Sequence, residues 1–329
     1  MNNKPLLDIK DLSIIYRSDN GNVKAVNKLN LHVEAGKTLG FVGETGAGKT
    51  TTALGVMGLV PNPPGEITEG EIFFEGENLL EKSEDEMRDI RGGKIAMIFQ
   101  DPMTSLNPLV TVGDQIAEMI LLHKDVNKAE AFELAGEMLE KVGIQKERAV
   151  EYPHQFSGGM RQRVVIAIAL ACNPQLIIAD EPTTALDVTI QAQVLELMKD
   201  LKKEFKTAMV LITHDLGVVA EICDQVAVIY AGTIVEYADI RSLYTKPMHP
   251  YTHGLFNSIP DLDDESETLN VINGMPPDPT DLPKGCPFNP RCDHATKQCR
   301  EEMPSYINVE DNHQVACFLF QKEGGANRD

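Results

Sequence analysis

The stretch GETGAGKT, residues 43–50, has the composition of a loop that holds a phosphate chain. A short apolar run precedes it at residues 38–42, and a run without an early helix breaker follows at residues 51–60, so the expected context is strand, loop and helix. In such a loop backbone N–H groups point at anionic oxygens, Lys49 reaches the β- and γ-phosphates and the Thr50 hydroxyl ligates Mg²⁺. A glycine-rich turn that binds nothing is the alternative, disfavoured by the match at all eight positions. The predicted nucleotide-binding residues of this stretch are Gly43, Glu44, Thr45, Gly46, Ala47, Gly48, Lys49, Thr50 and Thr51.

The composition is that of a globular protein with a strong acidic excess. The 329 residues are 42% hydrophobic and 24% charged, which suits about two domains. Thirty basic and fifty acidic side chains give a net charge of −20, which repels nucleic acid, so no nucleic-acid partner is expected. No stretch approaches the roughly 18 apolar residues that cross a bilayer, and the N-terminus lacks the apolar core of a secretory signal. The cytosol is therefore the default location.

Four short apolar runs are predicted to be strands of one parallel α/β sheet. They occupy residues 38–42, 95–99, 175–179 and 208–213, and they end respectively at the phosphate loop, Gln100, Asp180-Glu181 and His214. Because open parallel sheets bind ligands at the carboxyl ends of their strands, we expect these groups at one edge.

The polar groups at these strand ends suit ATP hydrolysis. Asp180 can hold Mg²⁺ through its water shell, and Glu181 can orient the attacking water or accept its proton. Taken singly, each has a simpler interpretation: the two carboxylates suit an acidic loop, and His214 suits a structural histidine.

A second anion site is predicted at residues 157–160. Ser157 can cap a helix whose first turn contains Gly158 and Gly159 and runs on through Met160, which leaves N–H groups exposed. A plain N-cap with glycines for close packing is the favoured interpretation if this segment is taken alone. Upstream, residues 101–156 change to helical character, which indicates an inserted helical subdomain.

Residues 8–40 alternate apolar and polar positions, which predicts antiparallel strands. Tyr16 ends the first of them. Its ring can stack on an adenine, although half-buried packing is the commoner role of a tyrosine in a strand.

The six cysteines are unevenly placed. Cys172 and Cys223 lie singly in apolar surroundings and are predicted to be buried small side chains. The other four are confined to the end of the chain with the spacing C-x5-C-x6-C-x17-C, at Cys286, Cys292, Cys299 and Cys317. In a reducing compartment such a cluster favours a metal over disulfides, and four thiolates suit either Zn²⁺ or a [4Fe–4S] cluster. His294 and His313 are close enough in sequence to serve as substitute ligands.

Together these residues resemble the ATP-binding cassette (ABC) ATPases over nearly the whole chain. The first stretch resembles the Walker A motif of that family, Gln100 its Q-loop glutamine, and FSGGM at residues 156–160 its signature motif, with Phe156 and Met160 in place of leucine and glutamine. Asp180 resembles the Walker B aspartate, and Glu181 the catalytic glutamate. The resemblance also covers the D-loop at Ala185, Leu186 and Asp187, the switch histidine at His214 and the adenine-stacking aromatic at Tyr16.

The resemblance implies a P-loop NTPase α/β fold of the ABC type with an antiparallel β subdomain. Its nucleotide-binding core is expected at residues 1–100 and 157–240, its inserted α-helical subdomain at 101–156, and a Pro- and Cys-rich C-terminal extension at 241–329. ATP on the Walker A loop of one subunit is expected to be closed over by Ser157, Gly158 and Gly159 of a second, identical or paralogous ATPase subunit.

Segments from residue 101 through the signature to KPMHPYTHGLFNSIP at 246–260 resemble the oligopeptide and dipeptide importer subfamily. Members serve as ATP-hydrolysing motors under two integral membrane permease subunits, fed by an extracytoplasmic solute-binding protein, so peripheral attachment to the cytoplasmic face of the membrane is implied. The tail GCPFNPRC, followed by Cys299 and Cys317, resembles the cysteine region of peptide-importer ATPases, some of which carry an iron–sulfur cluster. This resemblance favours [4Fe–4S] over zinc, and free buried thiols are the third alternative. The alternatives are an importer of nickel or another small solute, a soluble non-transport ABC ATPase, and an iron or redox sensor built on the tail.

Overall fold

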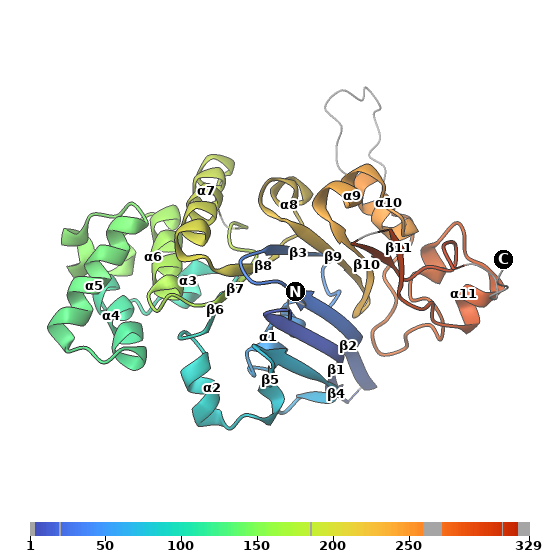
Figure 1. Cartoon of the computed structure of the whole chain (residues 1–329), viewed down its shortest axis with the longest axis horizontal. Helices are drawn as coiled ribbons and strands as arrows, with labels where there is room; N and C mark the ends of the chain where they lie inside the picture. Colours follow the sequence, from blue (N-terminus) through green and yellow to red (C-terminus); the bar gives the residue numbers. More distant parts are fainter. Residues whose placement is uncertain (1–3, 20, 185, 259–271, 311, 322–329) are drawn as a thin grey trace. The chain divides into compact units, whose positions relative to one another are not determined.

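The computed structural model describes residues 4–19, 21–184, 186–258, 272–310 and 312–321 (Figure 1). The chain forms two compact units, each built from separated stretches of sequence. The first takes in Val33–Thr38 and Leu79–Ile212, and the second takes in Leu6–His32, Leu39–Asn78 and the chain from Thr213 onward.

The strands of the first unit are parallel, and all of their residues except Met97 of β6 are buried. They are β6 (Ile95–Ile98), β7 (Leu176–Asp180) and β8 (Ala208–Ile212), in the order β6-β7-β8. Every residue of β7 and β8 is buried, which explains why these strands appear in the sequence as continuous apolar runs. The three strand predictions in this unit are confirmed, with ends that differ from the predicted ones by at most one residue.

The first unit contains the helices that the sequence predicts between residues 101 and 170, together with α2 before them and α7 after them. Their bounds are α2 (Glu84–Ile90), α3 (Pro102–Ser105), α4 (Val112–His123), α5 (Lys128–Lys141), α6 (Gly158–Leu170) and α7 (Val188–Phe205). Asn127 and Glu130 form a capping box at the start of α5. Helices α4, α5 and α6 pack against one another, as the green part of Figure 1 shows. The packed helices therefore include α6, which begins directly after the signature serine.

The second unit contains a four-stranded sheet in the order β2-β1-β4-β5. Its strands are β1 (Leu7–Ser18), β2 (Gly21–Val33), β4 (Gly65–Phe74) and β5 (Glu77–Asn78). β1 and β4 are antiparallel and pair from Leu7 with Phe74 to Tyr16 with Gly65. The predicted antiparallel strands near the N-terminus are thus present.

The remaining strands of the second unit are ordered β11-β12-β10-β9-β3. They are β3 (Thr38–Val42), β9 (Gln225–Tyr230), β10 (Thr233–Asp239), β11 (Ile307–Glu310) and β12 (His313–Val315), and β3 runs parallel to β9. The phosphate loop follows β3 and leads into α1 (Lys49–Val56). This helix ends earlier than the residue 60 expected from the sequence, because Gly58 adopts a left-handed φ of 61°.

The C-terminal part has more regular structure than its composition suggests. After α8 (Leu216–Ile222) and the β9-β10 hairpin come α9 (Ile240–Thr245), α10 (Pro250–Asn257) and α11 (Lys297–Glu301). Strand β12 pairs with β10, and Met248, Val315 and Cys317 form a small buried cluster beside it. The last strands of the chain are thus joined to the sheet that carries the phosphate loop.

Candidate functional site

Two glycines of the phosphate loop lie so close to neighbouring backbone that no other residue can replace them without strain. A Cβ atom on Gly43 would lie 2.3 Å from the carbonyl oxygen of Ile229, and one on Gly48 would lie 2.4 Å from that of Ala25. Gly48 also has a left-handed φ of 106°. Gly48 precedes the first turn of α1 without any side-chain cap, so the N–H groups at that helix end are available to an anion.

Lys49 lies inside this loop and is only 7% exposed. Its Nζ donates hydrogen bonds to the carbonyl oxygens of Gly43, at 2.7 Å, and Glu44, at 3.1 Å. Thr50 is exposed at the start of α1, whereas the Thr52 hydroxyl is used inside the helix and donates to the Gly48 oxygen. A cation, a hydroxyl and backbone N–H groups are therefore gathered at this loop, and their binding of a triphosphate stays a prediction.

The outer side of the loop is held by residues that the sequence analysis missed. The Glu44 carboxylate pairs with Arg291, and the Glu44 N–H donates to the Tyr251 hydroxyl at 2.9 Å. A cavity of about 150 Å³ lies beside Thr45, Gly46 and Ala47, and its other walls are Lys24, Glu44, Tyr230, Ala231, Pro276, Pro277, Pro279 and Leu282. No local sequence signal indicates these contacts, because their partners are more than 200 residues apart.

In the first unit, the two carboxylates lie at the carboxyl end of β7, Asp180 as its last residue and Glu181 directly after it. Asp180 is 4% exposed at the end of the strand. Glu181 has a left-handed φ of 46°, and its N–H donates to the Ile212 carbonyl at 2.8 Å. The Gln100 amide and the Thr184 hydroxyl both donate to Glu181 Oε2, at 3.0 and 2.9 Å. The amide and the carboxylate, which were expected at one edge of the sheet, are thus joined by a direct hydrogen bond, and Thr184 is an additional partner.

The signature segment begins α6 in the predicted way. Ser157 Oγ accepts the Met160 N–H at 3.4 Å, and both Ser157 and Gly158 are exposed. Gly159 approaches α7 closely, since a Cβ there would lie 2.4 Å from the Ile190 side chain. Asp187 caps α7 by accepting the Ile190 N–H at 3.0 Å. The exposed end of α6 is suited to contact an anion that another molecule carries.

For three further predicted residues, the position in the chain can be given but no contact with another site residue. His214 is exposed two residues beyond β8, and Tyr16 is half-buried opposite Gly65. Ala185, the first residue of the predicted D-loop, lies outside the described residues.

The four C-terminal cysteines line one small cavity of about 20 Å³, together with His249, Pro250, Phe288, Asn289, His294, Pro304, Phe318 and Leu319. Burial raises the pKa of Cys286 to about 12 and that of Cys317 to about 11. Such a cavity has room for about one water molecule. Within the described residues, no three His, Cys, Asp or Glu side chains are arranged to hold a metal ion. The expected iron–sulfur cluster is therefore not supported by this arrangement.

Of the other two cysteines, Cys223 is buried as expected. Cys172 is only partly buried, and its thiol donates to the Met119 carbonyl oxygen.

Two family models match the chain: "ABC transporter" at residues 26–184 and "Oligopeptide/dipeptide transporter, C-terminal region" at residues 235–299. The oligopeptide transport ATP-binding protein AppD of Bacillus subtilis (strain 168) is 49% identical over 321 residues, which are 97% of this chain and 98% of the relative. The chain belongs to the ABC transporter ATPases. Another member, the oligopeptide transport ATP-binding protein OppD of Escherichia coli (strain K12), is 52% identical over 301 residues, 91% of this chain and 89% of that one.

The ABC ATPase fold is also found among solved structures. A dimeric ATP-binding cassette in a post-hydrolysis state with ADP and Pi has a TM-score of 0.64 and 28% identity, and the match covers 71% of this chain and 99% of that one. Among the described residues of this ABC ATPase, no helix combines the length and hydropathy needed to span a bilayer.

Proposed function

We propose that this ABC ATPase is the ATP-hydrolysing motor subunit of a membrane importer for di- and oligopeptides. The observation that carries the proposal is that two features occur in the same chain: a loop with the features of a phosphate-binding site, and a C-terminal part that matches the oligopeptide/dipeptide transporter region. Relatives that match over about nine tenths of the chain or more are oligopeptide transport ATP-binding proteins.

The phosphate loop binds the triphosphate of ATP in this proposal. Lys49 exchanges the carbonyl oxygens of Gly43 and Glu44 for the β- and γ-phosphates, which is a favourable exchange because the new partners are ionised. The uncapped N–H groups of α1 face the same anion. Tyr16 stacks on the adenine ring.

Hydrolysis requires Mg²⁺ and a positioned water. The Thr50 hydroxyl, the Gln100 amide and the Asp180 carboxylate are oxygen donors of the kind that Mg²⁺ prefers, and the ion when bound neutralises charge on the phosphates. Glu181, held by Gln100 and Thr184, orients the water and accepts its proton. His214 is the second catalytic residue.

A second ATPase subunit, identical or paralogous, completes each site. The exposed Ser157 and Gly158, together with Gly159 and Met160 at the start of α6, bind the ATP held by the partner's loop, and Asp187 lies at the same interface. The proposal is supported by the exposure of this helix end and by dimeric solved relatives.

In this proposal the ATPase moves two integral membrane permease subunits. The nucleotide-binding core comprises residues 1–100 and 157–240, and residues 241–329 form the extension. The helical segment at residues 101–156 transmits the motion of the core to the permeases. Attachment to the cytoplasmic face of the membrane is then peripheral, and an extracytoplasmic solute-binding protein supplies the peptide. Co-purification with permeases tests this assembly, and purification of an active ATPase without them favours the soluble alternative.

The catalytic assignment is tested with Glu181→Gln. The variant is expected to bind ATP and dimerise but not to hydrolyse it, since the amide keeps the shape and loses the base. Glu196→Gln, an exposed position on α7, is the matched control and should hydrolyse ATP normally. Turnover by Glu181→Gln at the normal rate would remove Glu181 from the mechanism.

A metal on Cys286, Cys292, Cys299 and Cys317 is a further part of the proposal. Its support is that all four thiols line one cavity, and the side chains must rearrange to bind an ion or a [4Fe–4S] cluster. Elemental analysis for iron, acid-labile sulfide and zinc in the purified protein distinguishes the cluster from Zn²⁺, and a metal-free protein contradicts both.

A further inference from the structure

Glu44, the second residue of the phosphate loop, places a negative charge where a polyanion is to bind. Its side chain is 27% exposed, so water screens it only partly. Two like charges a few ångströms apart repel strongly when the surroundings are not bulk water. A loop that carries this carboxylate therefore needs something that offsets its charge and turns it away from the phosphates.

Arg291, near the opposite end of the chain, supplies the positive charge that offsets Glu44. It ends the short turn Asn289–Arg291, directly before Cys292, and its side chain is 4% exposed. Nη1 lies 2.7 Å from Glu44 Oε2, and Nη2 lies 3.1 Å from Glu44 Oε1. The pair is thus bidentate, a geometry in which the planar guanidinium fixes both the position and the orientation of the carboxylate.

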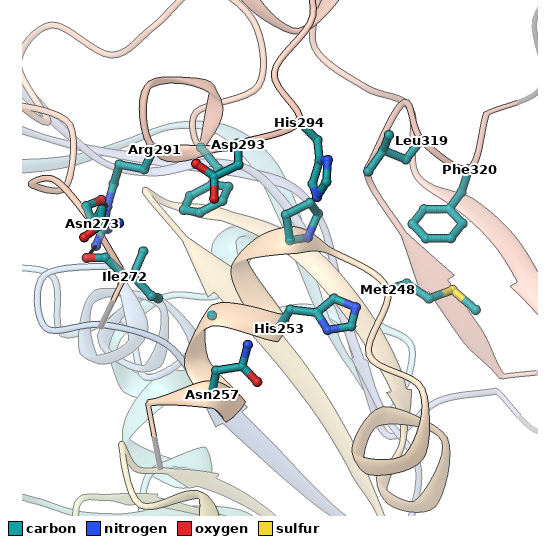
Figure 2. A pocket seen from close by; sticks show the side chains of 13 residues that line it. Met248, His253, Asn257, Ile272, Asn273, Arg291, Asp293, His294, Leu319 and Phe320 are labelled. Carbon is teal, nitrogen blue, oxygen red and sulfur yellow. Dashed lines mark hydrogen bonds between the residues drawn. The ribbon is translucent and has the colours of Figure 1, made fainter. Parts of the chain in front are cut away.

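The rest of the guanidinium is also engaged. Nε donates to the Asn273 carbonyl at 3.0 Å, Nη2 to the Ile272 carbonyl at 3.2 Å and Nη1 to the Tyr230 hydroxyl at 3.3 Å. Figure 2 shows a further pocket, which Arg291 lines together with Ile272 and Asn273 on one side and His253 and His294 on the other. The Arg291 side chain is directed toward Ile272 and Asn273. Because all three nitrogens have partners, the guanidinium has little freedom to follow Glu44 if the loop moves.

The backbone of Glu44 is held from the same region. Its N–H donates to the hydroxyl of Tyr251, whose ring lies 4.5 Å from that of Tyr230, centroid to centroid, in a tilted arrangement. The loop is therefore fixed at Glu44 through the side chain and the main chain together. If these contacts served only to hold the C-terminal segment in place, Arg291 would not need a bidentate pair with the only carboxylate of the loop. Nor would Tyr251 need to accept the Glu44 backbone N–H.

We propose that Arg291 is a positioning residue for ATP binding: it neutralises and orients Glu44, so that the phosphate loop accepts a polyanion without repulsion from its own carboxylate. This inference rests on the proposed ATP site and adds to it a requirement for the C-terminal segment. Arg291 acts on ATP through Glu44 and makes no contact with the phosphates.

The test is a double-mutant cycle in the full-length chain, made of Arg291→Ala, Glu44→Gln and the double variant, with Mg-ATP affinity and the kinetic constants as the measurements. Arg291→Ala is expected to raise the Kd and KM for ATP about tenfold with a smaller change in kcat, because an unpaired Glu44 repels the phosphates. Adding Glu44→Gln to Arg291→Ala is expected to restore most of the affinity. Arg291→Lys keeps the charge without the bidentate geometry and should fall between wild type and Arg291→Ala.

The controls separate charge from folding. Lys297→Ala removes a cation of the same segment whose pair with Glu301 is exposed, so its ATP affinity should equal that of the wild type. If Arg291→Ala does not fold, the comparison is made between Arg291→Lys and the double variant Glu44→Gln/Arg291→Lys. Unchanged ATP affinity in the Arg291 variants, or no recovery when Glu44→Gln is added, overturns the inference. A wild-type chain that fails to bind ATP contradicts the proposed function instead.

Discussion

Gln100 Nε2 donates a hydrogen bond of 3.0 Å to Glu181 Oε2 and so joins the residues that follow two neighbouring parallel strands, β6 and β7. The Thr184 hydroxyl donates to the same oxygen. Glu181 is thereby held from the preceding strand and from its own loop. The Glu181 backbone is in a left-handed conformation, which is unfavourable for this residue type unless its surroundings hold it. The two hydrogen bonds are part of those surroundings, and they fix the orientation of the carboxylate.

Removing the amide should therefore lower turnover more than ATP binding. We expect Gln100→Ala to reduce kcat about tenfold or more, because Glu181 loses the hydrogen bond from the Gln100 amide and Mg²⁺ loses a proposed ligand. The measurement is steady-state hydrolysis of Mg-ATP alongside equilibrium ATP binding. Gln298→Ala is the matched control: that amide donates to Glu302 at 3.1 Å on the exposed α11, and its loss should leave kcat unchanged. A kcat for Gln100→Ala equal to the wild-type value would show that the hydrogen bond is incidental.

The same pair shows what the sequence can predict. Strands β6, β7 and β8 are evident because burial on both faces requires continuous apolar runs, and the polar residue after each run follows from that boundary. Thr184 could not be chosen over its neighbour Thr183, since a hydroxyl in a loop has many possible partners. The structure shows that Thr184 is the partner of the carboxylate, beside the left-handed turn at Glu181.

The contacts of the C-terminal part could not be predicted at all. Arg291 and Glu44 are 247 residues apart, and nothing in a single sequence indicates such a pairing. Strand β12 has three residues, too few for a recognisable alternation. Glu236 lies within an otherwise apolar strand, where its complete burial depends on partners elsewhere in the chain.

Tyr251 offers a second test of how the phosphate loop is held. Tyr251→Phe removes the acceptor of the Glu44 N–H and is expected to cost about 1–3 kcal/mol of unfolding free energy and to raise the KM for ATP. Urea unfolding and ATP hydrolysis measure the two effects. Tyr244→Phe is the control, because that hydroxyl donates to the Leu216 carbonyl away from the loop. It should lose stability without a change in KM, and an equal rise in KM for both variants would refute a specific role of Tyr251.

The thiol pKa values predict slow alkylation of the metal-free protein. Burial raises the pKa of Cys286 to about 12, so at pH 8 its reactive thiolate is about a thousandfold scarcer than in the unfolded chain. Iodoacetamide labelling followed by peptide mass spectrometry, in buffer and in urea, gives the ratio of rates for each cysteine. We expect Cys286 and Cys317 to be strongly protected in buffer. Rapid labelling of Cys286 in the folded, metal-free protein would mean that the thiol is not buried there.

Among the substitutions considered, replacement of Glu236 is expected to cause the largest loss of stability. Its side chain is 0% exposed and joins three segments: Oε1 lies 2.7 Å from His313 Nε2 on β12 and accepts the Met248 N–H, and Oε2 accepts the His249 N–H before α10. Replacing it leaves two buried N–H donors and a buried imidazole without their acceptor. Glu236→Ala is therefore expected to lower the unfolding free energy by about 3–5 kcal/mol.

Lys246→Ala is the matched control for this buried pair. Lys246 pairs with Glu310 on the neighbouring strand β11, but both side chains are about half exposed or more, so water replaces the lost contact and stability should hardly change. Urea unfolding of the two variants beside the wild type makes the comparison. Because β12 and the start of α10 meet at Glu236, limited proteolysis should also cut Glu236→Ala first between residues 246 and 315. Equal stability of the two variants, with no new cleavage in that region, would show that the sheet holds the C-terminal part without this carboxylate.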